Sequence, residues 1–217
     1  MATVPVNTDD YKNATLTWYR QRLKEHGHGI QALSSGTVDR RAVRFNVLTG
    51  VGIGSGCSVL DVGCAYADYF THLEAQGCKV SYTGIDLLPE LIDEACRRHP
   101  GLDLQVRDLQ SNPFPPGSFD YVVSSQTFNL RFDEDSNMPL VERMMKLMFA
   151  TARKGTAVDF VTDYVDFREP YLRYHNPEKL FGFAKSITKR VVLRHDYPLY
   201  EFCLYLYPDF QAWGRPA

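Results

Sequence analysis

The chain has 217 residues, which suits one large domain and is short for two full ones. With 44% hydrophobic and 23% charged residues, its composition excludes disordered, collagen-like and coiled-coil proteins. The net charge of -2 gives no general attraction to nucleic acid or anionic lipid. Its five cysteines include no C-x-x-C pair, which favours reduced thiols in a cytosolic compartment.

The sequence predicts neither a secretion signal nor a membrane span. Its first residues lack a basic segment followed by an apolar run, and no stretch approaches the roughly 18 uncharged apolar residues that a span requires. We therefore expect a cytoplasmic protein without a membrane partner.

Two amphipathic helices are predicted at the start of the chain. The first covers residues 9–25, and the second is capped by Thr37 and runs to Gly50. We interpret residues 1–50 as a helical cap and residues 51–217 as the main domain, the two together forming one structural unit.

From residue 57, short apolar runs alternate with helical segments, a pattern typical of a mostly parallel sheet wrapped by helices. Expected strands cover residues 57–62, 80–87, 102–109, 119–125 and 156–164. Expected helices cover residues 66–76, 89–99 and 140–151, with another that starts at 176. Two final β-rich runs, at 191–197 and 202–207, are joined by too few residues for a parallel crossover, so they should form an antiparallel hairpin.

Three carboxylates come at the ends of the first three predicted strands: Asp61, Asp86 and Asp108. The carboxyl ends of parallel strands meet at one edge of a sheet, so these side chains should surround one crevice. Together they would repel a pyrophosphate, but they would hold a ligand with a sulfonium, an ammonium and ribose hydroxyls. S-adenosylmethionine is such a ligand. Asp86 suits the ribose diol, Asp108 the adenine amino group, and Asp61 the amino-acid end.

The turn after the first strand differs from a dinucleotide-binding turn. The G-x-G-x-x-G fingerprint needs a second glycine so that the pyrophosphate can approach the backbone, whereas Ala65 and Ala67 stand at the later positions here. The sequence therefore favours a sulfonium cofactor over a nicotinamide dinucleotide.

These motifs resemble those of class I S-adenosylmethionine-dependent methyltransferases. Residues 59–64 match the first motif of that superfamily and residues 84–86 the second. Asp108 and residues 112–124 match the segment that leads from the adenine-contacting carboxylate into the fourth strand. The similarity spans about residues 57–164 in the expected order. A finer resemblance, to small bacterial methyltransferases with undefined acceptors, supplies no substrate.

The resemblance implies an α/β fold: a Rossmann-like, doubly wound, seven-stranded sheet with a terminal antiparallel β-hairpin, plus N-terminal helices. The implied cofactor-binding residues follow the strands: Asp61, Gly63, Cys64, Ala65, Asp86, Leu87, Asp108, Leu109, Ser125 and Gln126. Family members commonly have glycine where this chain has Ala65, whose methyl group should narrow the loop.

We predict catalytic roles for His175 and Asn129, with His175 as a general base or acceptor clamp. The predicted substrate contacts are Tyr11, Tyr19, Phe128, Tyr164 and Arg173. No metal is expected, because none of the six histidines has metal-ligand spacing with a second His or a Cys.

The expected reaction is direct transfer of a methyl group from S-adenosylmethionine to an oxygen or nitrogen atom of a small polar molecule. Arg168 and Arg173, in the loop after the fifth strand, favour a polar or anionic acceptor. No nucleic-acid partner is expected, because the basic residues are scattered and the [ND]-P-P-[YF] tetrad is absent. The alternatives are an RNA or protein methyltransferase, a nicotinamide-dependent oxidoreductase, and a non-catalytic binding module. The oligomeric state stays open.

Overall fold

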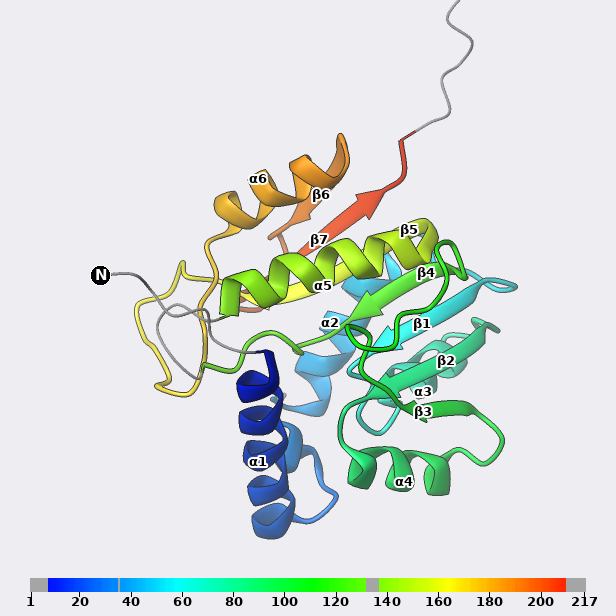
Figure 1. Ribbon diagram of the computed structural model, residues 1–217, viewed down its shortest axis with the longest axis vertical. Coiled ribbons are helices and arrows are strands. Elements are labelled where there is room, and N and C mark those ends of the chain that lie inside the picture. Colours follow the sequence, from blue (N-terminus) through cyan, green and yellow to red (C-terminus); the bar gives the residue numbers. More distant parts are fainter. Residues whose placement is uncertain (1–7, 35, 132–136, 210–217) are drawn as a thin grey trace, which may run out of the picture.

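The computed structural model describes residues 8–34, 36–131 and 137–209 (Figure 1). The strands are β1 (Ser58–Val62), β2 (Ser81–Asp86), β3 (Asp103–Val106), β4 (Phe119–Ser124), β5 (Ala152–Val161), β6 (Arg190–Arg194) and β7 (Glu201–Tyr207). The α-helices are α1 (Thr8–His26), α2 (Val38–Thr49), α3 (Asp68–Ala75), α4 (Pro89–Arg98), α5 (Asn137–Thr151) and α6 (Pro177–Ile187). A short 3-10 helix covers Ile30–Leu33.

Within the described residues, seven strands form one sheet in the order β3-β2-β1-β4-β5-β7-β6. Strands β1 to β5 run parallel to one another, while β7 is antiparallel to both β5 and β6. The predicted α/β sheet with a terminal antiparallel hairpin is therefore confirmed. The chain order reverses between β1 and β4, and a parallel sheet opens a ligand-binding crevice at such a point.

Helices cover both faces of the sheet, because successive side chains of each buried strand point to opposite faces. Val59 of β1 belongs to the core that contains side chains of α2 and α3. Its neighbour Leu60 belongs to the other core, which contains side chains of α5 and α6. Figure 1 shows α5 and α6 in front of the sheet and α2 and α3 behind it.

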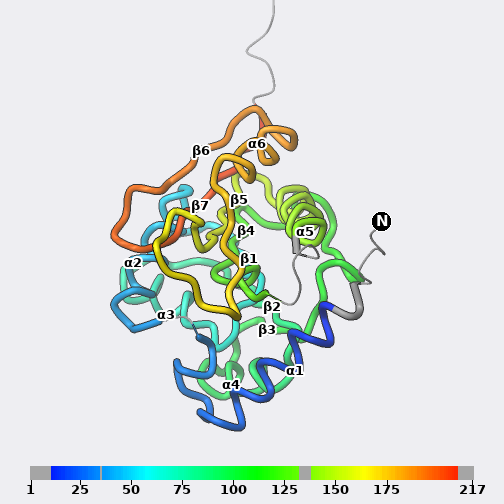
Figure 2. The backbone as a smooth tube through the Cα atoms, turned by 90° about the vertical axis from the view of Figure 1, so that its left-hand side faces the viewer, coloured from blue at the N-terminus to red at the C-terminus, as the bar shows by residue number. Residues whose placement is uncertain are grey.

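Helix α1 lies beside α4, next to the carboxyl ends of β1 and β2 (Figures 1 and 2). Its apolar side chains pack against a small core of three buried residues: Tyr66, Leu88 and Leu91. An ion pair of 2.7 Å between Arg20 Nε and Glu90 Oε1 also joins α1 to α4. One turn or less before Arg20, Trp18 of α1 stacks on Tyr171 at a centroid distance of 6.2 Å. The first helix thus closes over the edge where the predicted carboxylates lie.

Several predicted element boundaries need correction. Strand β6 ends at Arg194 instead of residue 197, and helix α5 begins at Asn137 instead of residue 140. Strand β3 ends at Val106, so Asp108 belongs to the following loop. Helix α3 begins at Asp68 instead of residue 66, because residues 64–67 form a turn. Strand β5 covers Ala152–Val161 instead of residues 156–164. Residues 1–7 of the predicted helical cap lie outside the described part of the chain. Among the described residues, no helix is long and apolar enough to cross a membrane.

Candidate functional site

A cavity opens at the carboxyl edge of the sheet, where the chain order reverses. The turns that follow β1, β2, β3 and β4 supply residues 61–65, 85–88, 107–110 and 125–128. Helices α1, α2 and α5 supply further lining residues: Tyr11, Lys12, Thr15, Leu16, Tyr19, Arg41, Arg44, Phe45, Leu140 and Met144. Four turns far apart in sequence therefore meet at one cavity, as the parallel topology predicts.

The turn after β1 has a left-handed backbone at three positions. Gly63 has φ +77°, and the alanines at 65 and 67 have φ values of +47° and +58°. A Cβ atom at Gly63 would lie 2.4 Å from Thr127 Oγ1, so only glycine fits there. The left-handed conformation costs a residue that has a side chain roughly 1 kcal/mol, and both Ala65 and Ala67 adopt it.

Asp86 ties the turn after β1 to the turn after β2. Its Oδ2 accepts a hydrogen bond of 3.0 Å from the N–H of Ala65, and its Oδ1 accepts one of 3.0 Å from the N–H of Leu88. Burial raises the pKa of Asp86, while these N–H donors oppose that rise. The carboxylate has further acceptor capacity, and Asp86 lines the cavity.

Asp61 is the most deeply buried of the three predicted carboxylates. The hydroxyl of Tyr82 donates a hydrogen bond of 2.5 Å to its Oδ2. Burial raises the pKa of Asp61 to about 7, helped by the negative charge of Asp86 and opposed by the Tyr82 hydrogen bond. A positively charged ligand group in the cavity would favour its ionised form.

Asp108 lies at the end of the cavity nearest α1. Lys12 Nζ lies 3.0 Å from its Oδ2, and the N–H of Gln110 donates to its Oδ1 over 2.9 Å. Burial acts against ionisation, but the Gln110 N–H and the Lys12 ammonium together hold the pKa of Asp108 below its usual value. Gln110 Oε1 is buried beside it and accepts no hydrogen bond from the described residues. This end of the cavity therefore offers two acceptor groups to a donor such as an exocyclic amine.

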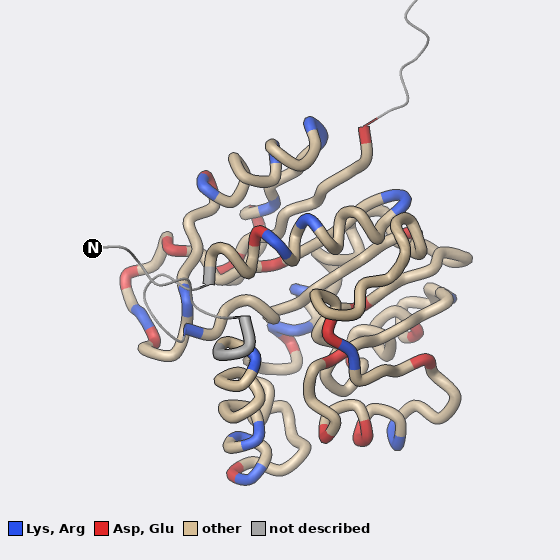
Figure 3. The backbone as a smooth tube through the Cα atoms, in the orientation of Figure 1, with Lys and Arg blue, Asp and Glu red and all other residues tan. Residues whose placement is uncertain are grey.

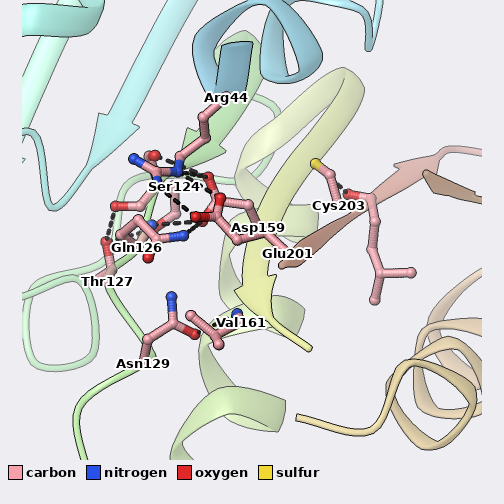
Figure 4. Close-up of polar contacts among 11 residues, drawn as sticks. Arg44, Ser124, Gln126, Thr127, Asn129, Asp159, Val161, Glu201 and Cys203 are labelled. Carbon is pink, nitrogen blue, oxygen red and sulfur yellow. Dashed lines mark hydrogen bonds and ion pairs between the residues drawn. The ribbon is translucent and has the colours of Figure 1, made fainter. Parts of the chain in front are cut away.

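A buried ionic network borders the cavity (Figure 4). Arg44 of α2 donates to both oxygens of Glu201 on β7, over 2.7 and 2.6 Å, and its Nε lies 3.9 Å from Asp159 Oδ2 on β5. Asp159 accepts hydrogen bonds from the hydroxyl of Ser125 at 2.8 Å and from the N–H of Gln126 at 2.7 Å. The network thus holds the turn after β4, where Gln126 has φ +59°.

All ten predicted cofactor-binding residues line this cavity, as do the predicted substrate contacts Tyr11, Tyr19 and Phe128. The sequence pattern did not indicate four further lining residues: Lys12, Arg41, Arg44 and Gln110. A charged residue on the apolar face of the second predicted helix was the one signal that could have revealed Arg44, which is only 3% exposed. Arg41 pairs with Asp68 at the start of α3.

The predicted catalytic residues lie elsewhere, which corrects their expected position. His175 is buried behind the turn after β4, with its Nε2 3.0 Å from the carbonyl oxygen of Phe128. Burial lowers the pKa of His175 to about 4, so the ring is neutral near pH 7. Asn129 Oδ1 accepts a hydrogen bond of 3.0 Å from the N–H of Val161. Both side chains hold backbone segments together, and neither lines the cavity formed by the described residues.

Two predicted substrate contacts also lie away from this cavity. Tyr164 is 61% exposed, and its hydroxyl donates to Glu178 over 2.5 Å. Arg173 lines a second cavity beside the loop that follows β5. Among the described residues, no group of three or more His, Cys, Asp and Glu side chains is placed to hold a metal ion.

Comparison with known proteins agrees with this geometry. The methyltransferase domain family matches residues 59–155. A protein of Mycobacterium tuberculosis provisionally named a methyltransferase is 33% identical over 152 residues, which cover 68% of this chain and 90% of that protein. The chain belongs to the class I S-adenosylmethionine-dependent methyltransferases. It is therefore an enzyme of this family, and its cofactor is S-adenosylmethionine.

Other similarities are more distant or cover less of the chain. The fatty-acid O-methyltransferase of Mycolicibacterium smegmatis is 37% identical over 82 residues, which cover 36% of this chain and 30% of that enzyme. The structure of DhpI in complex with SAH has a TM-score of 0.64 at 16% identity, covering 93% of this chain and 98% of DhpI. A methyltransferase structure from Aquifex aeolicus has a TM-score of 0.59 at 20% identity, covering 78% of this chain and 92% of that one. These structures share the fold.

The residues of this methyltransferase fit the cofactor. The unpartnered Gln110 Oε1 and the carboxylate of Asp108 offer acceptors for an adenine amino group. The absence of a side chain at Gly63 lets the turn after β1 pack directly against Thr127, which also lines the cavity. The buried carboxylate of Asp61 lies where a cationic ligand would lower its raised pKa.

Loss of the Arg44 guanidinium should destabilise the methyltransferase. In an Arg44→Leu variant, Glu201 and Asp159 would stay buried without their cation, so we expect the free energy of unfolding to fall by about 3–5 kcal/mol. Urea denaturation measures this loss. The double variant Arg44→Leu/Glu201→Leu should recover part of it, and a single variant within about 1 kcal/mol of wild type would contradict the prediction.

Glycine at position 65 should relieve the strained turn. Because Ala65 has φ +47°, we expect Ala65→Gly to raise the free energy of unfolding by about 0.5–1 kcal/mol. The matched control is Ala150→Gly on the exposed side of α5, where glycine should lower stability by a similar amount. Thermal unfolding of the two variants compares them directly, and equal destabilisation by both would show that the turn stores no strain.

Proposed function

We propose that this methyltransferase transfers a methyl group to an oxygen or nitrogen atom of a small acceptor molecule by direct displacement. Bound S-adenosylmethionine supplies an activated methyl group on a sulfonium, so the protein has mainly to align the reacting atoms and exclude water. The observation that carries the proposal is the meeting of Asp61, Asp86 and Asp108 in one cavity at the switch point of the sheet.

We assign the cavity residues to parts of the cofactor by their charge and place. Asp86 would accept from the ribose hydroxyls, and Asp108 with Gln110 from the adenine amino group. Asp61 would neutralise the positive amino-acid end, while the guanidinium of Arg44 would attract its carboxylate. The left-handed turn at residues 63–67 would bend around the same end of the molecule.

The tyrosines of α1 that line the cavity favour an acceptor whose reacting atom is already nucleophilic when it binds. Burial raises the pKa of Tyr11 to about 12 and also raises the pKa of Tyr19, so both phenols stay protonated near neutral pH. They can donate hydrogen bonds to an acceptor, but they cannot remove its proton. A carboxylate or a neutral amine needs no such help, and one relative of this chain is named a fatty-acid O-methyltransferase. A small acceptor with such a group fits best.

Binding of the demethylated cofactor should depend on Asp86. Calorimetry with S-adenosylhomocysteine should show binding to the wild type and a loss of at least tenfold in Asp86→Ala, because two acceptor oxygens are removed. Asp93→Asn, an exposed change on α4, is the matched control and should bind normally. Failure of the wild type to bind either form of the cofactor would refute the proposed function.

Affinity for S-adenosylmethionine should rise with pH. In the free protein Asp61, with a pKa of about 7, is largely protonated at pH 6, and a bound cation must displace that proton. We expect the dissociation constant to fall several-fold between pH 6 and pH 8 in the wild type. Asp61→Asn removes the titrating group, so its dissociation constant should change little over that interval. A wild-type constant independent of pH would contradict the assignment of Asp61.

A further inference from the structure

The turn after β4 connects the cofactor cavity with a buried carboxylate behind it. Ser125 lines the cavity, and its hydroxyl donates a hydrogen bond of 2.8 Å to Asp159 Oδ2. Asp159 is 1% exposed and lies outside the described lining of the cavity. The Ser125 hydroxyl therefore joins the cavity to a carboxylate that a bound acceptor does not reach directly.

The two oxygens of Asp159 have different partners. Oδ1 accepts hydrogen bonds from the N–H of Gln126 over 2.7 Å and from its side-chain Nε2 over 2.9 Å. Oδ2 accepts from Ser125 and lies 3.9 Å from Arg44 Nε. Figure 4 shows Gln126, Glu201 and Arg44 gathered around Asp159. The bonds to Oδ1 hold the carboxylate in place, so that Oδ2 stays within reach of the Ser125 hydroxyl.

Ser125 belongs to the end of the cavity that we assign to the amino-acid part of the cofactor. Two residues after it, Thr127 Oγ1 donates to the carbonyl oxygen of Val62 over 3.1 Å, so the turns after β4 and β1 are in contact. Arg44, assigned to the cofactor carboxylate, borders the same Asp159 oxygen as Ser125. Because the sulfonium carries the amino-acid chain, the methyl group is transferred near this turn.

The buried charges around Asp159 favour a cationic acceptor. Arg44 lies between the two carboxylates of Asp159 and Glu201, so these three side chains carry a net negative charge when all are ionised. The charge of Asp159 also raises the pKa of Asp61, which lines the cavity. At this end a carboxylate acceptor would meet repulsion, whereas an ammonium ion would be attracted.

Other cations that line the cavity have partners away from this turn. Lys12, one of the basic positions of α1 in Figure 3, pairs with Asp108 over 3.0 Å at the other end of the cavity. Arg41 of α2 pairs with Asp68 at the start of α3. Arg107, in the loop after β3, donates to backbone carbonyl oxygens of the same loop. The negative charge around Asp159 is therefore not offset by these groups.

The surroundings of Asp159 keep it able to take up a proton. Burial raises the pKa of Asp159 to about 6, and the positive charge of Arg44 opposes that rise. The other ionisable groups that face it come from β7, the hairpin turn and the end of β1: Glu201, Cys203, Tyr197 and Asp61. Burial raises the pKa of the thiol and of the phenol, so both stay neutral near pH 7. Asp159 is then mostly ionised at that pH.

We propose that Ser125 and Asp159 form a proton relay for an amine acceptor that binds as its ammonium ion. This inference rests on the proposed function and names its substrate class. One N–H proton passes to Ser125 Oγ while the Ser125 hydroxyl proton passes to Asp159 Oδ2. The freed lone pair of the nitrogen then forms a bond to the methyl carbon, and the bond between that carbon and sulfur breaks with its electron pair left on sulfur. After the methylated ammonium product leaves, the proton returns through Ser125 to water.

Binding brings the proton affinities of the two partners closer together. An amine has a pKa of about 10 in water, and burial beside a positively charged cofactor lowers that pKa by up to several units. Burial acts on Asp159 in the opposite direction and raises its pKa. The transfer is therefore less unfavourable inside the cavity than in water. Ser125 is a catalytic residue in this scheme, and Asp159 acts through it.

The first experiment tests, without turnover, which charge the cavity admits. Propylammonium chloride or sodium propionate is titrated into the protein saturated with S-adenosylhomocysteine, at constant ionic strength, and binding is followed by NMR and calorimetry. We expect saturable propylammonium binding that weakens at least fivefold in Ser125→Ala and in Asp159→Asn. Propionate should bind the wild type at least tenfold more weakly. The control Ser186→Ala, an exposed change on α6, should bind propylammonium like the wild type.

Affinity for S-adenosylhomocysteine separates the two proposals. Asp159→Asn should fold, because it keeps an oxygen for Gln126 and leaves Arg44 paired with Glu201. In both variants the affinity for S-adenosylhomocysteine should stay within about threefold of the wild type, and its loss in Ser125→Ala would assign this hydroxyl to the cofactor and overturn the relay. Absence of propylammonium binding to the loaded wild type, or tighter binding of propionate, would overturn the relay and leave the proposed function standing. Failure of the wild type to bind S-adenosylhomocysteine would instead refute the proposed function.

The second experiment separates a proton relay from a purely structural role. The fraction of cell metabolites that accepts most label from saturating radiolabelled S-adenosylmethionine is used at high dilution, where the initial rate is proportional to kcat/KM, between pH 5 and pH 9. The wild-type rate should rise up to about pH 6, where Asp159 becomes ionised, and then level off. In Ser125→Ala, which needs an acceptor that is already neutral, the rate should be at least tenfold lower at pH 7 and should keep rising to pH 9. Ser125→Thr, which keeps a hydroxyl, should restore the wild-type profile.

The labelled product identifies the acceptor group. A methylated amine should be retained by a cation exchanger and should resist mild alkali. A methyl ester, which mild alkali hydrolyses, or a product that the cation exchanger does not retain would overturn the proposal. A Ser125→Ala profile parallel to that of the wild type would also overturn it, because the hydroxyl would then carry no proton.

Discussion

The structure depends on the meeting of strand ends around the switch point between β1 and β4. Because β1 lies between β2 and β4, the turns after these strands face one cavity, and each brings polar groups to it. The carboxylate of Asp86 joins two of these turns through the N–H groups of Ala65 and Leu88. The same carboxylate is thus a brace of the free protein and the proposed acceptor for the ribose. Asp86 therefore serves both the folded structure and the proposed binding of the cofactor.

The ion network of Arg44 links helix α2 to strands β5 and β7. Burying three charged side chains is costly, and the geometry offsets the cost through two hydrogen bonds to Glu201 and the nearby Asp159. Burial raises the pKa of Asp159 to about 6, and the positive charge of Arg44 opposes that rise. Through Asp159 the network also fixes Ser125 and Gln126. The terminal hairpin therefore supports the cavity without lining it.

The loop that follows β5 is held differently from the turns at the cofactor cavity. It pairs with the segment after β4 and uses the neutral ring of His175 as a buried hydrogen-bonding group. The histidine that looked suited to catalysis thus positions the backbone of the turn after β4. Helix α1 meets this loop through Trp18 and Tyr171 and meets the cofactor cavity through Tyr19. One helix therefore contacts both the loop and the cofactor cavity.

The sequence by itself determined the order of strands and helices and the three carboxylates, because strand periodicity and the turn motifs are local properties of the chain. It did not determine which distant residues complete the site. Arg44 and Glu201 are 157 positions apart, and Lys12 and Asp108 are 96 apart, so only tertiary packing brings them together. The bridge between Thr162 and His175 likewise decided that this histidine points inward. Short-range pattern set the cofactor edge and its three carboxylates, whereas long-range packing brought the distant charged partners to them.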